Sequence, residues 1–201
     1  MIKFNTLDKS EPYKKFQDLY LQAFSKDQKN IEAVCISSYN KKNLEVSSRF
    51  VNLKYIRDNK FFFYSNYNSP KAIDFLDHNQ IAVNIFWSEI NIQIRIKAKI
   101  FKAKSDESDS YFNNRSKQKN ALAISSDQSK MIKNYNEVEK NYANTFELIK
   151  DKSILDRPDY WGGYYFVPYY FEFWEGHPNR LNIRHEFILY KEFWNKKILQ
   201  P

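Results

Sequence analysis

The stretch "INIQIRIKAKIF", residues 90–101, decides the fold. Isoleucine occupies positions 90, 92, 94 and 96, and a polar or charged residue stands at each position between them. Because successive side chains of a β-strand point to opposite faces, this alternation predicts a strand with one buried face. Its polar face would meet solvent, a ligand or another subunit.

Further segments on both sides of this strand show β and helical patterns. Strands are predicted at 31–38, 44–56, 61–66, 80–87, 163–173, 184–191 and 193–199. Helices are predicted at 11–29, where Ser10 and Pro12 suit the first turn, and at 69–79, where Ser69 and Pro70 do. Residues 106–150 are expected to be helical throughout.

This order of elements predicts a single α+β domain, mainly β, over residues 1–201. It has an N-terminal helical segment at 1–30, a helical insert at 106–150, and a small barrel of about six strands with peripheral helices. A barrel of this size is filled by its own side chains, so a large ligand would sit outside it or between subunits.

The composition fits a folded protein without Gly-rich phosphate loops. Hydrophobic residues make up 42% and glycine occurs only 3 times, and no dinucleotide or Walker-type motif is present. The net charge of +8 is spread over dispersed lysines. We read it as surface charge that also favours small phosphorylated ligands, and we expect no nucleic-acid partner.

Targeting and redox signals are also weak. Cys35, the one cysteine, lies in an apolar run and is predicted to be a buried, inert thiol. No signal peptide and no stretch of about 18 apolar residues is found, so we expect no membrane partner and a cytoplasmic location. The histidines His78, His177 and His185 lack metal-ligand spacing, so no metal site is expected.

Arginine, lysine, amide and aromatic side chains carry the remaining chemistry. "EFWEGHPNRLNIR", residues 172–184, places Arg180 and Arg184 behind an aromatic run. Arg49 and Lys54 fall in one predicted strand, and Lys71 opens a predicted helix. Cations and hydroxyls at strand ends suit a phosphate monoester, while amides and tryptophan suit the edge and the face of a planar ring.

These residues, taken in order, resemble the pyridoxamine 5'-phosphate oxidase family. The matching motifs before residue 130 are Arg49-Phe-Val-Asn-Leu-Lys54, Phe63-Tyr-Ser-Asn66, Ser69-Pro-Lys71, Ile92-Gln-Ile94, Tyr111-Phe-Asn-Asn-Arg115 and Gln128-Ser129. Later motifs are Trp161-Gly-Gly163, Glu172-Phe-Trp174, Arg180-Leu-Asn-Ile-Arg184 and Leu199-Gln-Pro201. The resemblance covers about residues 30–201, in order and at compatible spacing.

The resemblance implies an FMN-binding split β-barrel that works as a homodimer, with FMN in a cleft made by both subunits. The expected reaction oxidises pyridoxamine or pyridoxine 5'-phosphate to pyridoxal 5'-phosphate, with O2 as acceptor and H2O2 as product. Matched positions would bind FMN through Arg49, Phe50, Val51, Asn52, Leu53, Lys54, Tyr64, Ser65, Lys71, Gln93, Gln128, Ser129, Trp174 and Arg184. The substrate, a small phosphorylated B6 vitamer, would meet Lys54, Tyr111, Arg115, Lys119, Arg180 and Asn182, with Arg180 and Asn182 as the catalytic pair.

Departures from the family pattern concentrate on the substrate side. Asn182 and Ile183 stand where the family has His and Asp, and Lys119 replaces a serine. Pro70 and Ile92 each replace an arginine. The alternative is therefore a divergent member that binds FMN but acts on another small molecule, or a flavin- or B6-phosphate-binding protein without this turnover.

Overall fold

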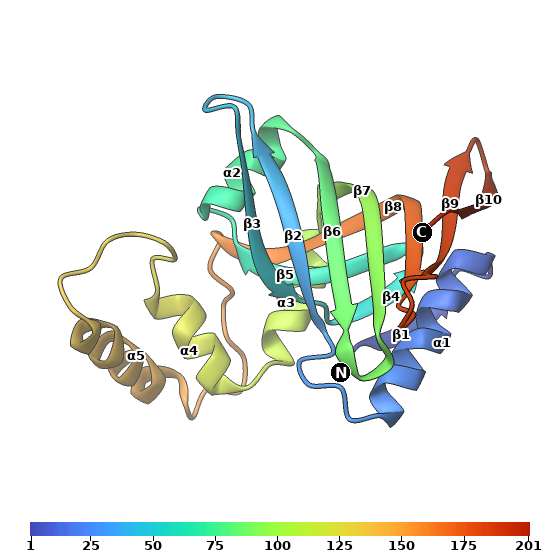
Figure 1. Cartoon of the computed structure of the whole chain (residues 1–201). Coiled ribbons are helices and arrows are strands. Elements are labelled where there is room, and N and C mark those ends of the chain that lie inside the picture. Colours follow the sequence, from blue (N-terminus) through green and yellow to red (C-terminus); the bar gives the residue numbers. More distant parts are fainter.

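The computed structural model describes residues 1–201 and consists of one ten-stranded sheet with helices around it (Figure 1). The strands are β1 (Lys3–Leu7), β2 (Ala33–Asn40), β3 (Glu45–Asn52), β4 (Tyr55–Asp58), β5 (Lys60–Asn66), β6 (Gln80–Trp87), β7 (Ile92–Lys102), β8 (Trp161–Glu175), β9 (Ile183–Tyr190) and β10 (Phe193–Leu199). Hydrogen bonds order them β1-β4-β5-β8-β7-β6-β2-β3, and the β9–β10 hairpin branches from β8.

The predicted strand at 90–101 is confirmed as β7, at the centre of this sheet. It pairs antiparallel with β6 and with the long strand β8, and Ile92, Ile94 and Ile96 are buried as the alternation requires. The strand begins two residues later than predicted. Ser88–Ile90 forms a 3-10 turn, and Asn91 adopts left-handed backbone angles before the strand starts.

The main core lies inside the curved sheet and is closed by the first helix. This helix, α1 (Glu11–Ser25), buries Tyr13, Phe16 and Tyr20 against the barrel. The Phe16 ring packs edge-on to Phe61 at 5.2 Å between centroids, an arrangement that aromatic rings favour. The interior is therefore filled by side chains, as expected for a small barrel.

The remaining helices are α2 (Pro70–Asp77), α3 (Ser105–Asn113), α4 (Lys117–Ser125) and α5 (Tyr135–Ile149). Helices α4 and α5 stand beside the barrel as a separate lobe, while α3 lies between them and the sheet (Figure 1). A second, smaller core holds this region together and contains Phe112, Ala121, Ile149, Leu155 and Trp161.

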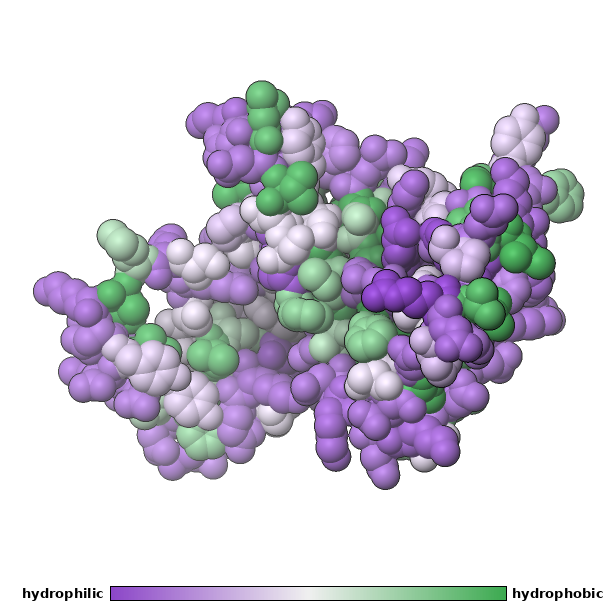
Figure 2. Space-filling model, viewed as in Figure 1, coloured by the Kyte–Doolittle hydropathy of each residue, from purple (hydrophilic) through white to green (hydrophobic).

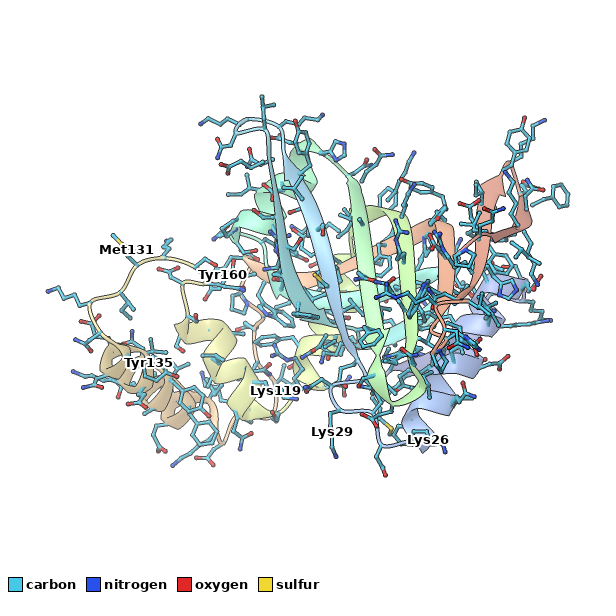
Figure 3. All side chains as sticks on the ribbon, in the orientation of Figure 1. Lys26, Lys29, Lys119, Met131, Tyr135 and Tyr160 are labelled. Carbon is cyan, nitrogen blue, oxygen red and sulfur yellow. The ribbon has the colours of Figure 1, made fainter.

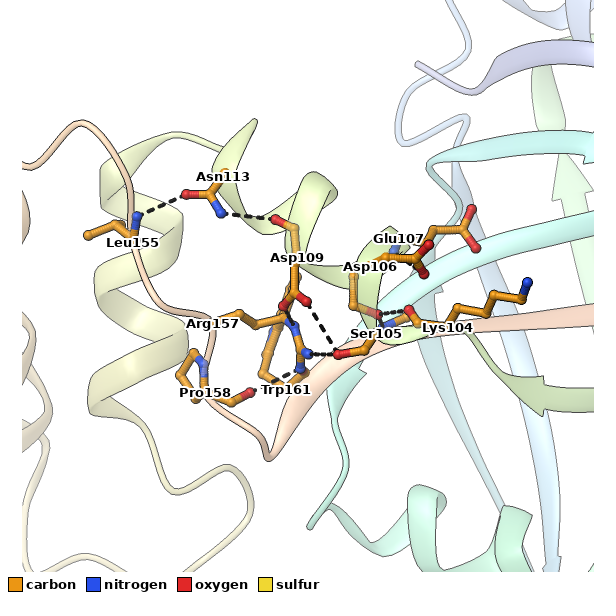
Figure 4. Close-up of polar contacts among 12 residues, drawn as sticks. Lys104, Ser105, Asp106, Glu107, Asp109, Asn113, Leu155, Arg157, Pro158 and Trp161 are labelled. Atoms are coloured by element: carbon orange, nitrogen blue, oxygen red, sulfur yellow. Dashed lines mark hydrogen bonds and ion pairs between the residues drawn. The ribbon is translucent and has the colours of Figure 1, made fainter.

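One arginine ties the connector before β8 to α3. Arg157 forms an ion pair with Asp109 at 2.6 Å and donates to the Ser105 hydroxyl at 2.8 Å and to the Trp161 carbonyl (Figure 4). The Arg157 side chain is only 8% exposed, whereas its partner Asp109 is 50% exposed. These contacts fix the position at which Trp161 enters the sheet.

Several sequence predictions are corrected by this structure. The strand predicted at 44–56 is two strands, because the Leu53 amide bonds the Glu32 carbonyl and the Lys54 amide bonds the Phe62 carbonyl, which moves the chain from β2 to β5. The insert at 106–150 is three helices, interrupted at residues 114–116 and 126–134. Helix 11–29 ends at Ser25, and helix 69–79 ends at Asp77.

Two further predictions were wrong. The sheet has ten strands where eight were predicted, since β1, which joins β4 in parallel, was not predicted and the segment 44–56 forms both β3 and β4. Strand β1 has no apolar alternation that would have revealed it. Cys35 is partly exposed, not buried, because Val34 and Ile36 point into the core and Cys35 points outward.

Candidate active site

A large cavity of about 1900 Å³ lies outside the barrel, between the sheet and helices α2, α3 and α4. This agrees with the expectation that a large ligand would not fit inside. Thirteen predicted site residues line it: Arg49, Phe50, Val51, Asn52, Lys54, Tyr64, Ser65, Lys71, Tyr111, Arg115, Lys119, Gln128 and Ser129. The folding of four separate sequence segments brings these residues together.

One end of the cavity is formed by Arg49 of β3 and Lys71 of α2. Lys71 is only 7% exposed, and its ammonium group donates to the Ser69 hydroxyl at 3.0 Å. Ser69 precedes the helix as predicted, but its hydroxyl donates to the Asn66 carbonyl instead of capping the helix. Ser65, on β5, lines the same cavity.

Lys71 has no acidic partner, and its burial has a measurable consequence. Desolvation, followed by the nearby charge of Arg49, lowers the pKa of Lys71 to about 8. Desolvation also lowers the pKa of Arg49. A bound anion such as a phosphate would relieve both penalties, so this donor set fits a phosphate group.

The buried carboxylate of Asp74 holds Arg49 in place through the Ser38 hydroxyl, which lies between them. The Arg49 guanidinium donates to the Ser38 hydroxyl at 2.7 Å, and that hydroxyl donates to Asp74 at 2.6 Å. Asp74 also accepts from the Asn40 side chain at 2.9 Å. The hydroxyl proton of Ser38 is thereby committed to Asp74, which leaves its lone pairs for Arg49.

A second group of cations lies farther along the cavity. Lys54 follows β3, Arg115 follows α3, and Lys119 lies on the barrel side of α4 (Figure 3). Desolvation lowers the pKa of Lys54, and the positive charges of Lys119 and Arg115 lower it further. One nitrogen of Arg115, Nη1, is buried without a hydrogen-bond partner. This orphaned donor fits a second anion.

Aromatic rings line the cavity between the two cation groups. Tyr64 stacks on Tyr111 at 3.7 Å between centroids, and Trp161 continues the stack at 5.4 Å from Tyr64. Arg115 lies 4.4 Å over the Trp161 ring. These stacked rings give the cavity an apolar wall beside its cations.

The other predicted flavin contacts lie on a different face. Gln93, Trp174 and Arg184 are consecutive cross-strand partners on β7, β8 and β9, and none of them lines the cavity. Leu53 is fully buried in the core, so only its backbone is available to a ligand. Within one chain the structure therefore separates the predicted flavin set into two groups.

The predicted catalytic pair lies in the exposed loop between β8 and β9. Arg180 has left-handed backbone angles, with φ of 60°, and the Asn182 amide oxygen accepts from the His177 backbone N–H at 3.1 Å. Neither residue lines the cavity of its own chain. Asn182 keeps its NH2 group and the second lone pair of its amide oxygen free for a ligand.

Sequence reasoning missed several residues that shape the site. Ser38 and Asp74 support Arg49, and Tyr55 bonds both Tyr64 and Glu107, at 3.0 and 2.8 Å. Asp74 sits in a helix with ordinary amphipathic spacing, so no local pattern could have identified it. The Glu172-Phe-Trp174 motif was noticed, but no role was predicted for Glu172 itself.

Comparison with solved structures defines the class of fold. The chain resembles PhzG from Burkholderia lata, solved with tetrahydrophenazine-1-carboxylic acid, with a TM-score of 0.89 and 23% identity over 96% of this chain and 93% of that one. It also resembles a pyridoxamine 5'-phosphate oxidase-related, FMN-binding protein from Nostoc punctiforme, with a TM-score of 0.77 and 11% identity over 96% and 99%. The fold is the split β-barrel of FMN-binding proteins, as predicted.

The chain belongs to the pyridoxamine 5'-phosphate oxidase family, and its class is oxidoreductase. Residues 21–148 match the model described as pyridoxamine 5'-phosphate oxidase, and residues 161–201 match the pyridoxine 5'-phosphate oxidase C-terminal dimerisation region. The resemblance predicted from motifs is thus confirmed. The second match supports homodimerisation.

Named relatives include pyridoxine/pyridoxamine 5'-phosphate oxidases from three bacteria. The Cytophaga hutchinsonii protein is 42% identical over 69% of this chain and 64% of its own length. The Legionella pneumophila (strain Paris) protein is 30% identical over 96% and 88%, and the Haemophilus influenzae (strain Rd) protein is 37% identical over 77% and 73%. The aligned region is therefore slightly under two thirds of the Cytophaga relative.

The structure offers neither a membrane-crossing helix nor a metal-binding cluster. No helix combines the length and apolar character that crossing a membrane would require. No group of three or more His, Cys, Asp or Glu side chains is arranged to hold a metal ion. The predicted cytoplasmic location stays a prediction.

Proposed function

We propose that this single-domain chain oxidises pyridoxamine or pyridoxine 5'-phosphate to pyridoxal 5'-phosphate, with FMN as cofactor and O2 as electron acceptor. One observation carries the proposal. Among the cations that line one cavity are two groups, Arg49 with Lys71 and Lys54 with Arg115 and Lys119, and none of these five forms a salt bridge. Such a cavity suits two phosphorylated molecules side by side.

The first group is proposed to hold the FMN phosphate. Arg49 and Lys71 supply charge, Ser65 and Tyr64 supply hydroxyls, and Gln128 and Ser129 close the site from the loop after α4. The backbone from Phe50 to Leu53 would follow the cofactor, since Leu53 offers no side chain. When bound, the flavin supplies the two-electron chemistry that side chains lack.

The second group is proposed to hold the substrate phosphate. Lys54, Arg115 and Lys119 present positive charge, and Tyr111 presents its hydroxyl and ring. Lys119 replaces a neutral serine of the family pattern, so it adds a cation that strengthens attraction to a phosphate. Holding the phosphate fixes where the carbon to be oxidised lies.

Arg180 and Asn182 are proposed to contact the reacting end of the substrate. Arg180 carries a permanent charge and five donors, and Asn182 has a free NH2 group. In the balanced reaction, pyridoxine phosphate and O2 give pyridoxal phosphate and H2O2. For the amine, water also enters and ammonia leaves.

A homodimer is proposed to unite the two groups of flavin contacts. In each site the partner chain would contribute the Gln93, Trp174 and Arg184 face. That outer face also exposes apolar side chains: Phe50 is 74% exposed and Phe86 is 55% exposed. Figure 2 shows such apolar side chains gathered at the centre of the face formed by β3, β2 and β6. Burying them in a subunit interface would stabilise the dimer.

The reaction is tested by adding pyridoxamine 5'-phosphate to the aerobic, FMN-loaded protein. Pyridoxal 5'-phosphate and H2O2 are expected in equal amounts. Retained flavin with no product would reject this reaction and leave the fold assignment intact.

One observation favours a second function, flavin binding with a different small substrate. Asn182 replaces the family histidine, and a neutral amide can neither carry positive charge nor shuttle a proton; its oxygen also accepts from the His177 backbone N–H. Flavin reduction by another amine or alcohol, but not by B6 phosphates, would support this alternative.

A further inference from the structure

The face that carries Arg184 contains a buried carboxylate that the proposed function does not use. Glu172, on β8, is 2% exposed. One of its oxygens accepts from Arg184 through both Nε and Nη2, at 2.9 and 2.8 Å. The other accepts from Arg95 at 2.8 Å and from the Tyr170 hydroxyl at 2.9 Å. All its hydrogen-bonding partners converge from the same face.

This arrangement fixes the direction of the Arg184 guanidinium. Two nitrogens are bound to Glu172, and Nη1 donates to the Gln200 carbonyl at 2.9 Å. The side chain remains 25% exposed, so it still offers an open edge to a ligand. A guanidinium held on two sides loses little conformational entropy when it binds.

The charge balance on this face also matters. Glu172 contributes one negative charge against the two positive charges of Arg95 and Arg184. Glu186 stands directly opposite Glu172 on β9, so two arginines and two carboxylates share this face, next to Gln93 and Trp174. Arg95 is 50% exposed and makes its ion pair with the opposite oxygen, so its role can be separated from that of Arg184.

We propose that Glu172 is a positioning residue that orients Arg184 toward the flavin bound at the subunit interface. The inference rests on the proposed function, because it assumes that Arg184 contacts FMN. Glu172 would touch neither cofactor nor substrate. It would act by holding Arg184 in the one direction that reaches the flavin.

The test compares FMN dissociation constants of single and double variants by flavin fluorescence. Glu172→Gln keeps the shape and removes the charge, and we expect FMN to bind about 5- to 10-fold more weakly. Arg184→Ala should weaken binding by at least as much. The double variant should bind FMN no more weakly than Arg184→Ala alone, because Glu172 acts through Arg184.

Two matched control variants distinguish a change in the orientation of Arg184 from a general disturbance of the charged cluster. Arg95→Met removes a cation from the same carboxylate but leaves Arg184 bound to it, so FMN affinity should change less than about 2-fold. Glu186→Gln removes the acid directly opposite Glu172, which is ion-paired to neither arginine, and should change little. The two variants change the net charge in opposite directions, so equal losses in Arg95→Met and Glu172→Gln would mean a general disturbance of the cluster and overturn the proposal.

The remaining outcomes are also decisive. If Arg184→Ala weakens FMN binding and Glu172→Gln does not, the inference fails and the proposed function stands. If neither changes it, the flavin contact of Arg184 is wrong as well. Should Glu172→Gln not fold, Glu172→Asp keeps the charge but withdraws the carboxylate from Arg184 by one methylene, and it should weaken FMN binding by about 2-fold or more; unchanged affinity in that variant would overturn the inference.

Discussion

At the scale of single residues, the buried cation Lys71 dominates the proposed cofactor site. Its pKa of about 8 lies below the ordinary lysine value of 10.5, because desolvation disfavours the charged form. The unfolded chain therefore binds this proton more tightly than the native protein. By this group alone, the stability of the cofactor-free protein rises as pH increases from about 8 to about 10.5.

The affinity for FMN should instead fall as the pH rises above about 8. FMN needs a protonated Lys71 and a doubly charged phosphate, whose second pKa is about 6. Affinity should therefore be highest between about pH 6 and 8 and fall by up to about tenfold per pH unit above 8.

Fluorescence titrations of FMN affinity across pH 6–9.5 would check this decline. In Lys71→Met, the fall in affinity above pH 8 (the basic limb) should disappear. Lys26→Met, at an exposed lysine of the α1 C-terminus, is the matched control (Figure 3). A basic limb that persists in Lys71→Met would assign the titration to another group.

The residues also show what sequence could reveal. Arg49, Lys54 and Lys71 were predicted as anion ligands, and the structure places all three in one cavity. The supporting residues Ser38 and Asp74 could not be predicted. Their hydrogen bond joins positions 36 residues apart, and neither position has a local pattern that suggests a partner.

At the scale of elements, helix α2 and strand β3 are joined through Asp74. Asp74→Asn puts an amide donor where a carboxylate oxygen accepts, so Ser38 or Asn40 loses its acceptor. Arg49 then loses its fixed orientation. We expect FMN to bind more weakly by about 0.5–1.5 kcal/mol, roughly 2- to 12-fold.

Calorimetric titration would measure this change, with Asp77→Asn, at the exposed end of the same helix, as control. An affinity equal to that of the unmodified protein would show that Arg49 needs no support from Asp74.

Strand β8 packs closely against Ala103 and Tyr64 at Gly163. A Cβ at Gly163 would lie 2.9 Å from the Ala103 Cβ and 3.1 Å from the Tyr64 ring. Since Ala103 cannot turn away, Gly163→Ala should destabilise the protein by about 1–3 kcal/mol. Chemical denaturation would measure the loss, and an unchanged free energy of unfolding would show that the backbone shifts freely there.

Element boundaries were the weakest part of the sequence prediction. The break at Leu53–Lys54 was missed because an apolar, β-favouring run continues through it. The chain changes pairing partner there, which is a tertiary effect. The isoleucine alternation of β7, by contrast, depends only on strand geometry, and it was predicted correctly.

At the scale of the whole molecule, the account predicts that each active site needs two chains. Lys71→Met disables the cavity and Arg184→Ala disables the face that the partner contributes. A heterodimer of the two variants contains one site with both defects and one intact site. After subunit exchange, roughly a quarter of sites should bind FMN with normal affinity.

This result is measured by FMN titration of the mixture against each variant alone. The control mixes Lys71→Met with the double variant that carries both Lys71→Met and Arg184→Ala. No site should recover normal FMN affinity, because every cavity then lacks Lys71. No recovery in the first mixture, despite proven exchange, would place both residues in one chain's site.

The central claim is that bound flavin accepts electrons from a B6 phosphate. The most direct measurement is the visible spectrum of the FMN-loaded, desalted protein before and after anaerobic addition of pyridoxamine 5'-phosphate. We expect a retained flavin band at about 450 nm that bleaches on addition and returns with air. A retained band that stays unchanged would contradict the claim.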